Sequence, residues 1–120
     1  MLKGTLIVVG VVGIAAAVML PIGAAGQNSA RISSTRVIDN ERVTVMRLTF
    51  PPGAREQVHV TPQDLVVMQA TPGDVEVTLD KETSTGRVET GKSWYVSKVT
   101  PHAYSNVGKD PFDLVVVFLK

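Results

Sequence analysis

The chain contains no cysteine among its 120 residues. It can therefore form no disulfide, no thiolate metal site and no thiol nucleophile, and it offers no cysteine for lipid attachment. A dominant charge is also absent, because 12 Lys and Arg oppose 11 Asp and Glu, which gives a formal net charge of +1. Such a balance provides no electrostatic basis for binding nucleic acid or an acidic membrane surface. We therefore expect no nucleic-acid partner.

Aromatic residues are also few, with one Trp, two Tyr and three Phe in the whole chain. Beyond residue 36, no long stretch repeats apolar residues at the spacing of a helix, whereas short apolar segments alternate with turn residues. Residues 43–50 and 74–80, for example, alternate apolar with polar side chains, as a strand with one solvated face does. About eight or nine such strands predict an all-β sandwich or barrel with a single hydrophobic core.

The individual strands can be placed from these alternations and from the Pro and Gly residues between them. A polar hairpin tip is expected at residues 81–86, and the closing Val-rich run is expected to be buried on both faces of its sheet. The segments predicted as strands are 43–50, 58–60, 65–68, 74–80, 87–90, 94–96, 103–107 and 112–119.

One long apolar run at the N-terminus differs from this pattern. Residues 4–26 carry no charge, follow a single basic residue at Lys3, and end in Gly and Ala after Pro21. A basic start, an apolar centre and a small-residue exit are typical of a secretory signal. The run is also long enough to span a bilayer as an uncleaved helix.

We interpret residues 1–26 as a signal peptide, or alternatively as a membrane anchor helix. Residues 27–35 are polar and small and are interpreted as a linker, and residues 36–120 as the barrel domain. The domain is then exported, to the periplasm or the extracellular space, or it is held at the membrane by residues 4–26 alone. Loss of the signal would remove Lys3 and leave 11 basic and 11 acidic residues.

The chain's two histidines lie in two motifs of fixed spacing. The positions of the first motif are separated by five, one, four and six residues and are occupied by Gly53, His59, Thr61, Val66 and Gly73. The positions of the second are separated by five, one, two and three residues and are occupied by Gly91, Ser97, Val99, His102 and Asn106. Strands and a turn separate the two motifs, so we expect the fold to bring the two imidazoles together.

These spacings resemble the two motifs of the cupin superfamily, in particular its small single-domain members. Those motifs are G-x5-H-x-H-x(3,4)-E-x6-G and G-x5-P-x-G-x2-H-x3-N, and the resemblance covers about residues 35–120. It implies a double-stranded β-helix, a jelly-roll barrel of two antiparallel sheets with an internal pocket. The chain departs from the motifs at four positions, which are occupied by Thr61, Val66, Ser97 and Val99.

The resemblance also implies where a metal would bind. In metal-bearing relatives, three His and one Glu bind Mn, Fe, Ni or Zn, and H-x-H works because residues two apart on a strand face the same side. Here Thr61 replaces the second His, and a neutral hydroxyl is a poor ligand for such ions. Val66 replaces the Glu and has no ligand atom. Only His59 and His102 remain as metal ligands, fewer than a stable site usually needs.

The leading hypothesis is therefore an exported domain that binds a small molecule in the barrel pocket, with a catalytic metal lost or weakly held. No cofactor is certain. Tyr104 shares strand parity with His102 and is included in the pocket, whereas Arg55 and Glu56 are interpreted as solvated surface charges. The residues predicted to line the pocket are His59, Thr61, Gln63, His102 and Tyr104.

Two alternatives remain open. The first is a metal-dependent enzyme of the isomerase or oxygenase type, with Fe, Mn, Ni or Zn on His59 and His102, assisted by water and by Asp64 or Gln63. The second is a structural or oligomerising barrel that forms a homodimer through edge strands, to which residues 112–119 could contribute. No Ser-His-Asp set or phosphate-binding loop is present, and no catalytic residue is assigned.

Overall fold

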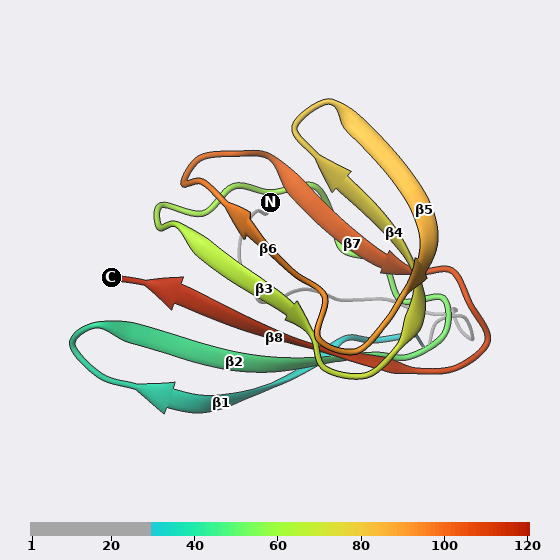
Figure 1. Cartoon of the computed structure of the whole chain (residues 1–120), viewed down its shortest axis with the longest axis horizontal. Helices are drawn as coiled ribbons and strands as arrows, with labels where there is room; N and C mark the ends of the chain where they lie inside the picture. The colour runs from blue at the N-terminus through green and yellow to red at the C-terminus, as the bar shows by residue number, and fades with distance from the viewer. Residues whose placement is uncertain (1–29) are drawn as a thin grey trace, which may run out of the picture.

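The computed structural model describes residues 30–120, which form eight strands and no helix (Figure 1). Within this part of the chain, therefore, no helix could serve as a membrane span. The segment interpreted as a signal or anchor, residues 1–26, lies outside the described residues, as does the first part of the expected linker. The prediction of an all-β domain is confirmed for the described residues.

The strands form two antiparallel sheets, which Figure 1 shows in order from its lower edge upward. The larger sheet has the order β1-β2-β8-β3-β6, and its strands are β1 (Ser33–Asp39), β2 (Val43–Phe50), β8 (Phe112–Leu119), β3 (Leu65–Gln69) and β6 (Ser93–Val96). The smaller sheet has the order β5-β4-β7, and its strands are β5 (Glu82–Val88), β4 (Gly73–Leu79) and β7 (His102–Asn106). Two facing antiparallel sheets of this kind fit the expected jelly-roll barrel.

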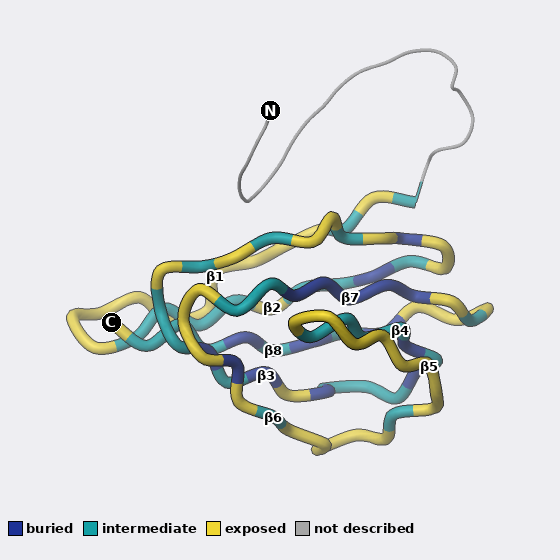
Figure 2. Tube along the Cα trace, turned by 90° about the horizontal axis from the view of Figure 1, so that it is seen from above, coloured by how far each residue is buried: buried dark blue, intermediate teal, exposed yellow. Residues whose placement is uncertain are grey.

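The core lies between the two sheets, where Figure 2 shows the buried stretches of β3, β7 and β8. Alternate residues of β3 and β8 face inward, as the period of a strand requires. At the end of the core, the rings of Phe50 and Phe112 stack with centroids 5.0 Å apart. β8 was expected to be buried on both faces, but its outward residues are only half-buried, because one face of the larger sheet is open to solvent.

Three segments differ from the strand predictions. β5 starts at Glu82 inside the expected hairpin tip, so the β4–β5 turn is only two residues long, with Asp80 in the left-handed conformation at a φ of 58°. β1 starts at Ser33, within the range expected to be a linker. Both strands are exposed along nearly their whole length, so no apolar alternation reveals them. Residues 58–60 form no strand, only a single bridge at His59.

β8 lies in the middle of the larger sheet, between β2 and β3. The expectation that this closing strand contributes an edge is therefore wrong, because both of its sides are already hydrogen-bonded. Among the described residues, the larger sheet has its edges at β1 and β6.

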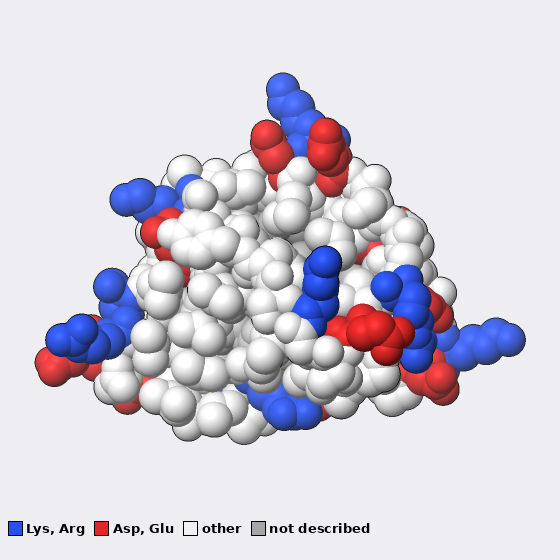
Figure 3. Space-filling model, in the orientation of Figure 1, with Lys and Arg blue, Asp and Glu red and all other residues white. Residues whose placement is uncertain are grey.

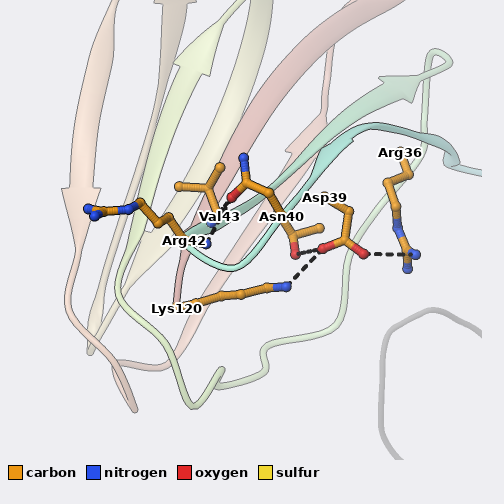
Figure 4. Close-up of polar contacts among 7 residues, drawn as sticks. Arg36, Asp39, Asn40, Arg42, Val43 and Lys120 are labelled. Carbon is orange, nitrogen blue, oxygen red and sulfur yellow. Dashed lines mark hydrogen bonds and ion pairs between the residues drawn. The ribbon is translucent and has the colours of Figure 1, made fainter.

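Surface charges are arranged as mixed pairs, and Figure 3 shows blue and red groups together around a broad uncharged area. One such cluster joins the first hairpin to the end of β8 (Figure 4). The Asp39 carboxylate accepts hydrogen bonds from Thr44 at 2.9 Å, Lys120 at 2.9 Å and Arg36 at 3.5 Å. The pairs lie in water, so they fix local geometry more than they add stability.

Candidate functional site

The two histidines lie side by side, because the segment after β2 runs antiparallel to β7. The His59 N–H donates to the His102 carbonyl at 3.0 Å, and the His102 N–H donates to the His59 carbonyl at 2.9 Å. The ring centroids are 4.4 Å apart. His59 is half-buried and His102 is only 2% exposed. The structure thus brings together the two residues that the motifs single out.

Each imidazole is oriented by a backbone carbonyl two residues earlier in the chain. His59 Nδ1 lies 2.8 Å from the Gln57 carbonyl oxygen, and His102 Nδ1 lies 2.8 Å from the Thr100 carbonyl oxygen. A carbonyl can only accept, so each Nδ1 must carry the proton. Each neutral ring is left with an unprotonated Nε2, a hydrogen-bond acceptor and the atom through which many histidines bind metals.

Glu56, expected from the sequence to be a surface charge, instead lies at the site. Its Oε1 accepts the Tyr104 N–H at 3.0 Å, while its own N–H donates to the Tyr104 carbonyl at 3.0 Å. The bridges from Arg55 to Ser105 and from His59 to His102 differ in register by one residue, so the segment holds one extra residue here. This bulge turns Glu56 inward, toward the same cavity as His59. Arg55 remains exposed and pairs with Glu76 at 3.1 Å, as expected of a surface charge.

A cavity of about 50 Å³ lies between the two sheets at this point. Its apolar wall comes from the larger sheet and is formed by Leu48, Leu65, Val67, Val116 and Phe118. Its polar wall comes from β7 and the segment before β3 and is formed by Glu56, His59, Thr61, His102 and Tyr104. No Lys or Arg is among these residues.

Burial keeps the polar wall uncharged near neutral pH. It raises the pKa of the Glu56 carboxyl to about 8, although the hydrogen bond from Tyr104 acts in the opposite direction. Burial also lowers the pKa of both His59 and His102, and it raises the pKa of Tyr104. In each case the reason is that a charged form would lose water and find no opposite charge.

Tyr104 extends the polar wall towards β6. Its hydroxyl oxygen accepts a hydrogen bond from Trp94 Nε1 at 3.0 Å, and the two rings meet edge to face. Trp94 thus contributes its N–H to the site, which the side-by-side pair of Trp94 and Tyr95 in the sequence could not reveal.

Four of the five residues predicted to line the pocket do so. His59, Thr61, His102 and Tyr104 line the cavity, whereas Gln63 is not among its lining residues. The Thr61 hydroxyl donates to the Gln63 carbonyl at 3.0 Å, so it is already engaged.

Asp64, considered as a supplementary ligand, does not line the cavity either. Its Oδ1 accepts the Lys98 N–H at 2.7 Å, and the hydrogen bonds from Tyr95 and then Lys98 lower the pKa of its carboxyl. Asp64 therefore ties the loop before β7 to the start of β3.

The donor set does not fit the four-ligand metal site that the motifs imply. On β3, Leu65 rather than Val66 faces the cavity, because side chains alternate along the strand and Leu65 lies on the buried face. The position corresponding to the Glu is therefore Leu65, and it too lacks a ligand atom. Within residues 30–120, no cluster of three His, Asp or Glu could hold a metal ion.

The other motif residues have structural roles. Gly53 and Gly91 have φ values of 84° and 93°, which a residue with a Cβ rarely adopts. Val99 occupies a motif glycine position and keeps the left-handed φ of 57°. The fully buried Asn106 donates to the carbonyls of Phe50 and Asp110, both at 2.8 Å, which joins the ends of β2 and β7.

A larger depression of about 420 Å³ lies near the end of β5, lined by residues 87–90 and Lys92. Its Arg87 pairs with Asp74 at 3.6 Å and with Glu89 at 3.6 Å. It is a solvent-exposed surface without buried polar groups, so we assign the site to the smaller internal cavity.

Comparison with known proteins identifies the fold. Residues 46–118 match the family described as Cupin domain. A crystal structure of a cupin domain from Bordetella pertussis aligns with a TM-score of 0.69 and 28% identity, covering 79% of this chain and 99% of that one. A search among curated proteins gave no match.

More distant structures share the fold alone. A RmlC-like cupin with a double-stranded β-helix from Methanocaldococcus jannaschii has a TM-score of 0.64 and 16% identity, covering 79% of this chain and 85% of that one. The DMSP lyase DddQ from Ruegeria pomeroyi has a TM-score of 0.66 and 17% identity, covering 75% of this chain and 47% of that one. From the match over residues 46–118 and the shared architecture, the chain belongs to the cupin-domain family.

Proposed function

We propose that the protein is an exported cupin domain that binds a small molecule in the cavity between its sheets, without a tightly held catalytic metal. The observation that carries this proposal is the polar wall, where two imidazoles with unprotonated Nε2 atoms, a carboxyl and a phenol line one cavity. Convergent polar groups opposite an apolar wall are typical of small-molecule sites. Export is supported by the uncharged apolar run of residues 4–26.

The test is a thermal-shift screen of the purified domain against small polar molecules, because a ligand that binds only the native state raises the melting temperature. We expect hits whose shift is lost in the His102→Ala variant. A panel that leaves the melting temperature unchanged at every concentration would contradict the proposal. Mass spectrometry of the mature N-terminus in the exported fraction tests the signal, and retention of residues 1–26 in the membrane fraction would favour the anchor instead.

A second candidate is a weak metal site on the two histidines, as in a metal-dependent enzyme. It is favoured by the hydrogen bonds that both Nδ1 atoms donate to backbone carbonyls, because metal-binding histidines are oriented by such partners. Elemental analysis of protein purified without chelator separates the candidates. One equivalent of Fe, Mn, Ni or Zn, lost in His59→Ala or His102→Ala, would replace the first proposal with this one.

A homodimer is a further candidate for the assembly, and β1 is the strand that supports it. All seven of its residues are exposed, including Val37 and Ile38 at 56% and 46%. An exposed edge strand can pair with its counterpart in a second copy. Sedimentation analysis tests this, and a monomer at all concentrations would exclude it.

A further inference from the structure

The hydrogen-bonding capacity of the cavity is divided between acceptors and donors. Because the Nδ1 protons of His59 and His102 are taken by backbone carbonyls, both Nε2 atoms can only accept. The two rings line the same cavity, with their centroids 4.4 Å apart. A ligand at this side of the cavity must therefore offer N–H or O–H donors.

The opposite requirement comes from Glu56 and Tyr104. Glu56 Oε1 is occupied by the Tyr104 N–H, which leaves Oε2 for the cavity. The Tyr104 oxygen accepts from Trp94, and within residues 30–120 no protein group accepts the hydroxyl proton of Tyr104. Burial without a Lys or Arg among the lining residues, together with the raised pKa of Glu56, favours a protonated carboxyl near neutral pH, and both groups then have a proton to donate to a ligand.

Charge and size restrict the ligand further. Among residues 30–120, no Lys or Arg lines the cavity, so an anion would find no counter-ion in this part of the chain. The cavity holds about 50 Å³, whereas a cavity of roughly 150 Å³ accommodates benzene. The space inside suits a molecule of a few non-hydrogen atoms, and a larger ligand would have to extend through the open side of the cavity.

We propose that Glu56 is the specificity-determining residue of this cavity, and that the ligand is a compact uncharged molecule carrying both a donor for the imidazoles and an acceptor oxygen for Glu56. This inference rests on the proposed function, because it names the ligand class of the same cavity. It assigns to Glu56 a role that no position of the family motifs supplies.

Three probes of nearly identical shape test the ligand class. Acetamide has both a donor and an acceptor, acetone has the acceptor alone, and acetate is an anion near neutral pH. Titrations of the ¹⁵N-labelled protein are followed at the Tyr104 amide and at the imidazole nitrogens of His59 and His102. We expect saturable acetamide shifts with a dissociation constant on the order of millimolar, as befits so small a ligand. Acetone and acetate should bind at least about tenfold more weakly, because each lacks one required property.

Variants at position 56 test the residue itself. Gln has the shape of a protonated Glu and can accept the Tyr104 N–H while donating an amide proton, so Glu56→Gln should bind acetamide within about threefold of the parent. In Glu56→Met the side chain fills the space but forms no hydrogen bonds, so the affinity for acetamide should fall at least about tenfold. Glu89→Gln, the same substitution at an exposed residue outside the cavity, is the control and should bind as the parent does.

The outcomes separate the inference from the proposed function. Acetone or acetate binding as tightly as acetamide overturns the ligand class, and undiminished binding by Glu56→Met overturns the role of Glu56; cavity binding stands in both cases. If none of the probes shifts the cavity resonances but the thermal-shift screen finds a larger ligand that depends on His102, the inference fails and the proposed function stands. If neither experiment finds a ligand, both fail. Should Glu56→Met not fold, the comparison of probes on the parent protein still decides the ligand class.

Discussion

Glu56 and Tyr104 are joined by two hydrogen bonds, one of which replaces backbone pairing with a side chain. The Glu56 N–H donates to the Tyr104 carbonyl, as in an ordinary ladder, but the Tyr104 N–H donates to the Glu56 carboxyl at 3.0 Å. A bulge therefore places a carboxyl inside a barrel that provides it with no positive partner.

This burial predicts a pH-dependent stability. The pKa of Glu56 rises from 4.5 in the unfolded chain to about 8 in the fold, so the native state keeps a proton that the unfolded state has released. The free energy of unfolding should then fall between about pH 5 and 8, by up to about 1.4 kcal/mol per pH unit. His59 and His102 have lowered pKa values and destabilise the fold only below about pH 6.5, so the window from there to pH 8 isolates Glu56.

Urea denaturation of the parent and of Glu56→Gln across this range measures the effect. The variant cannot ionise at this position, so its stability relative to the parent should increase as the pH rises towards 8. If the free energies of unfolding of the two proteins change with pH in parallel, Glu56 ionises in the fold as easily as in the unfolded chain.

Val99→Gly is expected to stabilise the domain by about 1 kcal/mol. Val99 has a φ of 57°, which is strained for a β-branched residue, and it is 67% exposed, so little apolar contact is lost. The gain is reduced by the greater freedom of glycine in the unfolded chain. Val58→Gly, at an exposed position without a left-handed φ, should instead lower the melting temperature. If both variants shift the melting temperature in the same direction, strain at Val99 is not the cause.

Gly73→Ala should destabilise the fold by roughly 1–3 kcal/mol or more. A Cβ at this position would lie 2.5 to 2.9 Å from atoms of Phe112, which is already stacked on Phe50. Gly86→Ala is the matched control, because a Cβ there meets nothing within 4 Å. Thermal melts of the two variants check the prediction. An equal fall in melting temperature would mean that the Phe112 side chain moves aside at little cost.

Restoring the missing ligands should create a metal site. In Thr61→His with Leu65→Glu, the four ligands of the family motif would line the cavity beside Glu56, and we expect about one equivalent of Ni, Zn, Mn or Fe with a raised melting temperature on metal addition. The same Thr61→His change combined with Val66→Glu should bind no better than Thr61→His alone, because Val66 faces away from the cavity. Elemental analysis distinguishes the two, and preferential binding by the Val66→Glu protein would reverse our assignment of the strand faces.

The central strands and the histidine pair could be predicted from the sequence, because each depends on a local pattern. Val75 and Val77 alternate with polar residues, and the motif spacings place His59 and His102 in one barrel. β1 is not predicted and β5 is predicted to start too late, because exposed strands have no apolar face to reveal them.

The missed site residues have a common cause. Strand parity puts residues 56 and 59 on opposite faces, and only the bulge reverses this for Glu56. Similarly, the spacing to Gly73 selects Val66 as the motif position, whereas the folded strand turns Leu65, one residue earlier, toward the cavity. The size of the cavity depends on packing between strands distant in the chain, which no local pattern reports.

The hydrogen bonds from both imidazole rings to backbone carbonyls also determine which residues of the cavity could be substituted. The hydrogen bond that orients each ring comes from its own main chain and not from a neighbouring side chain. The lining could then be redesigned, residue by residue, around a fixed pair of basic atoms, which makes this barrel a practical starting point for new binding proteins.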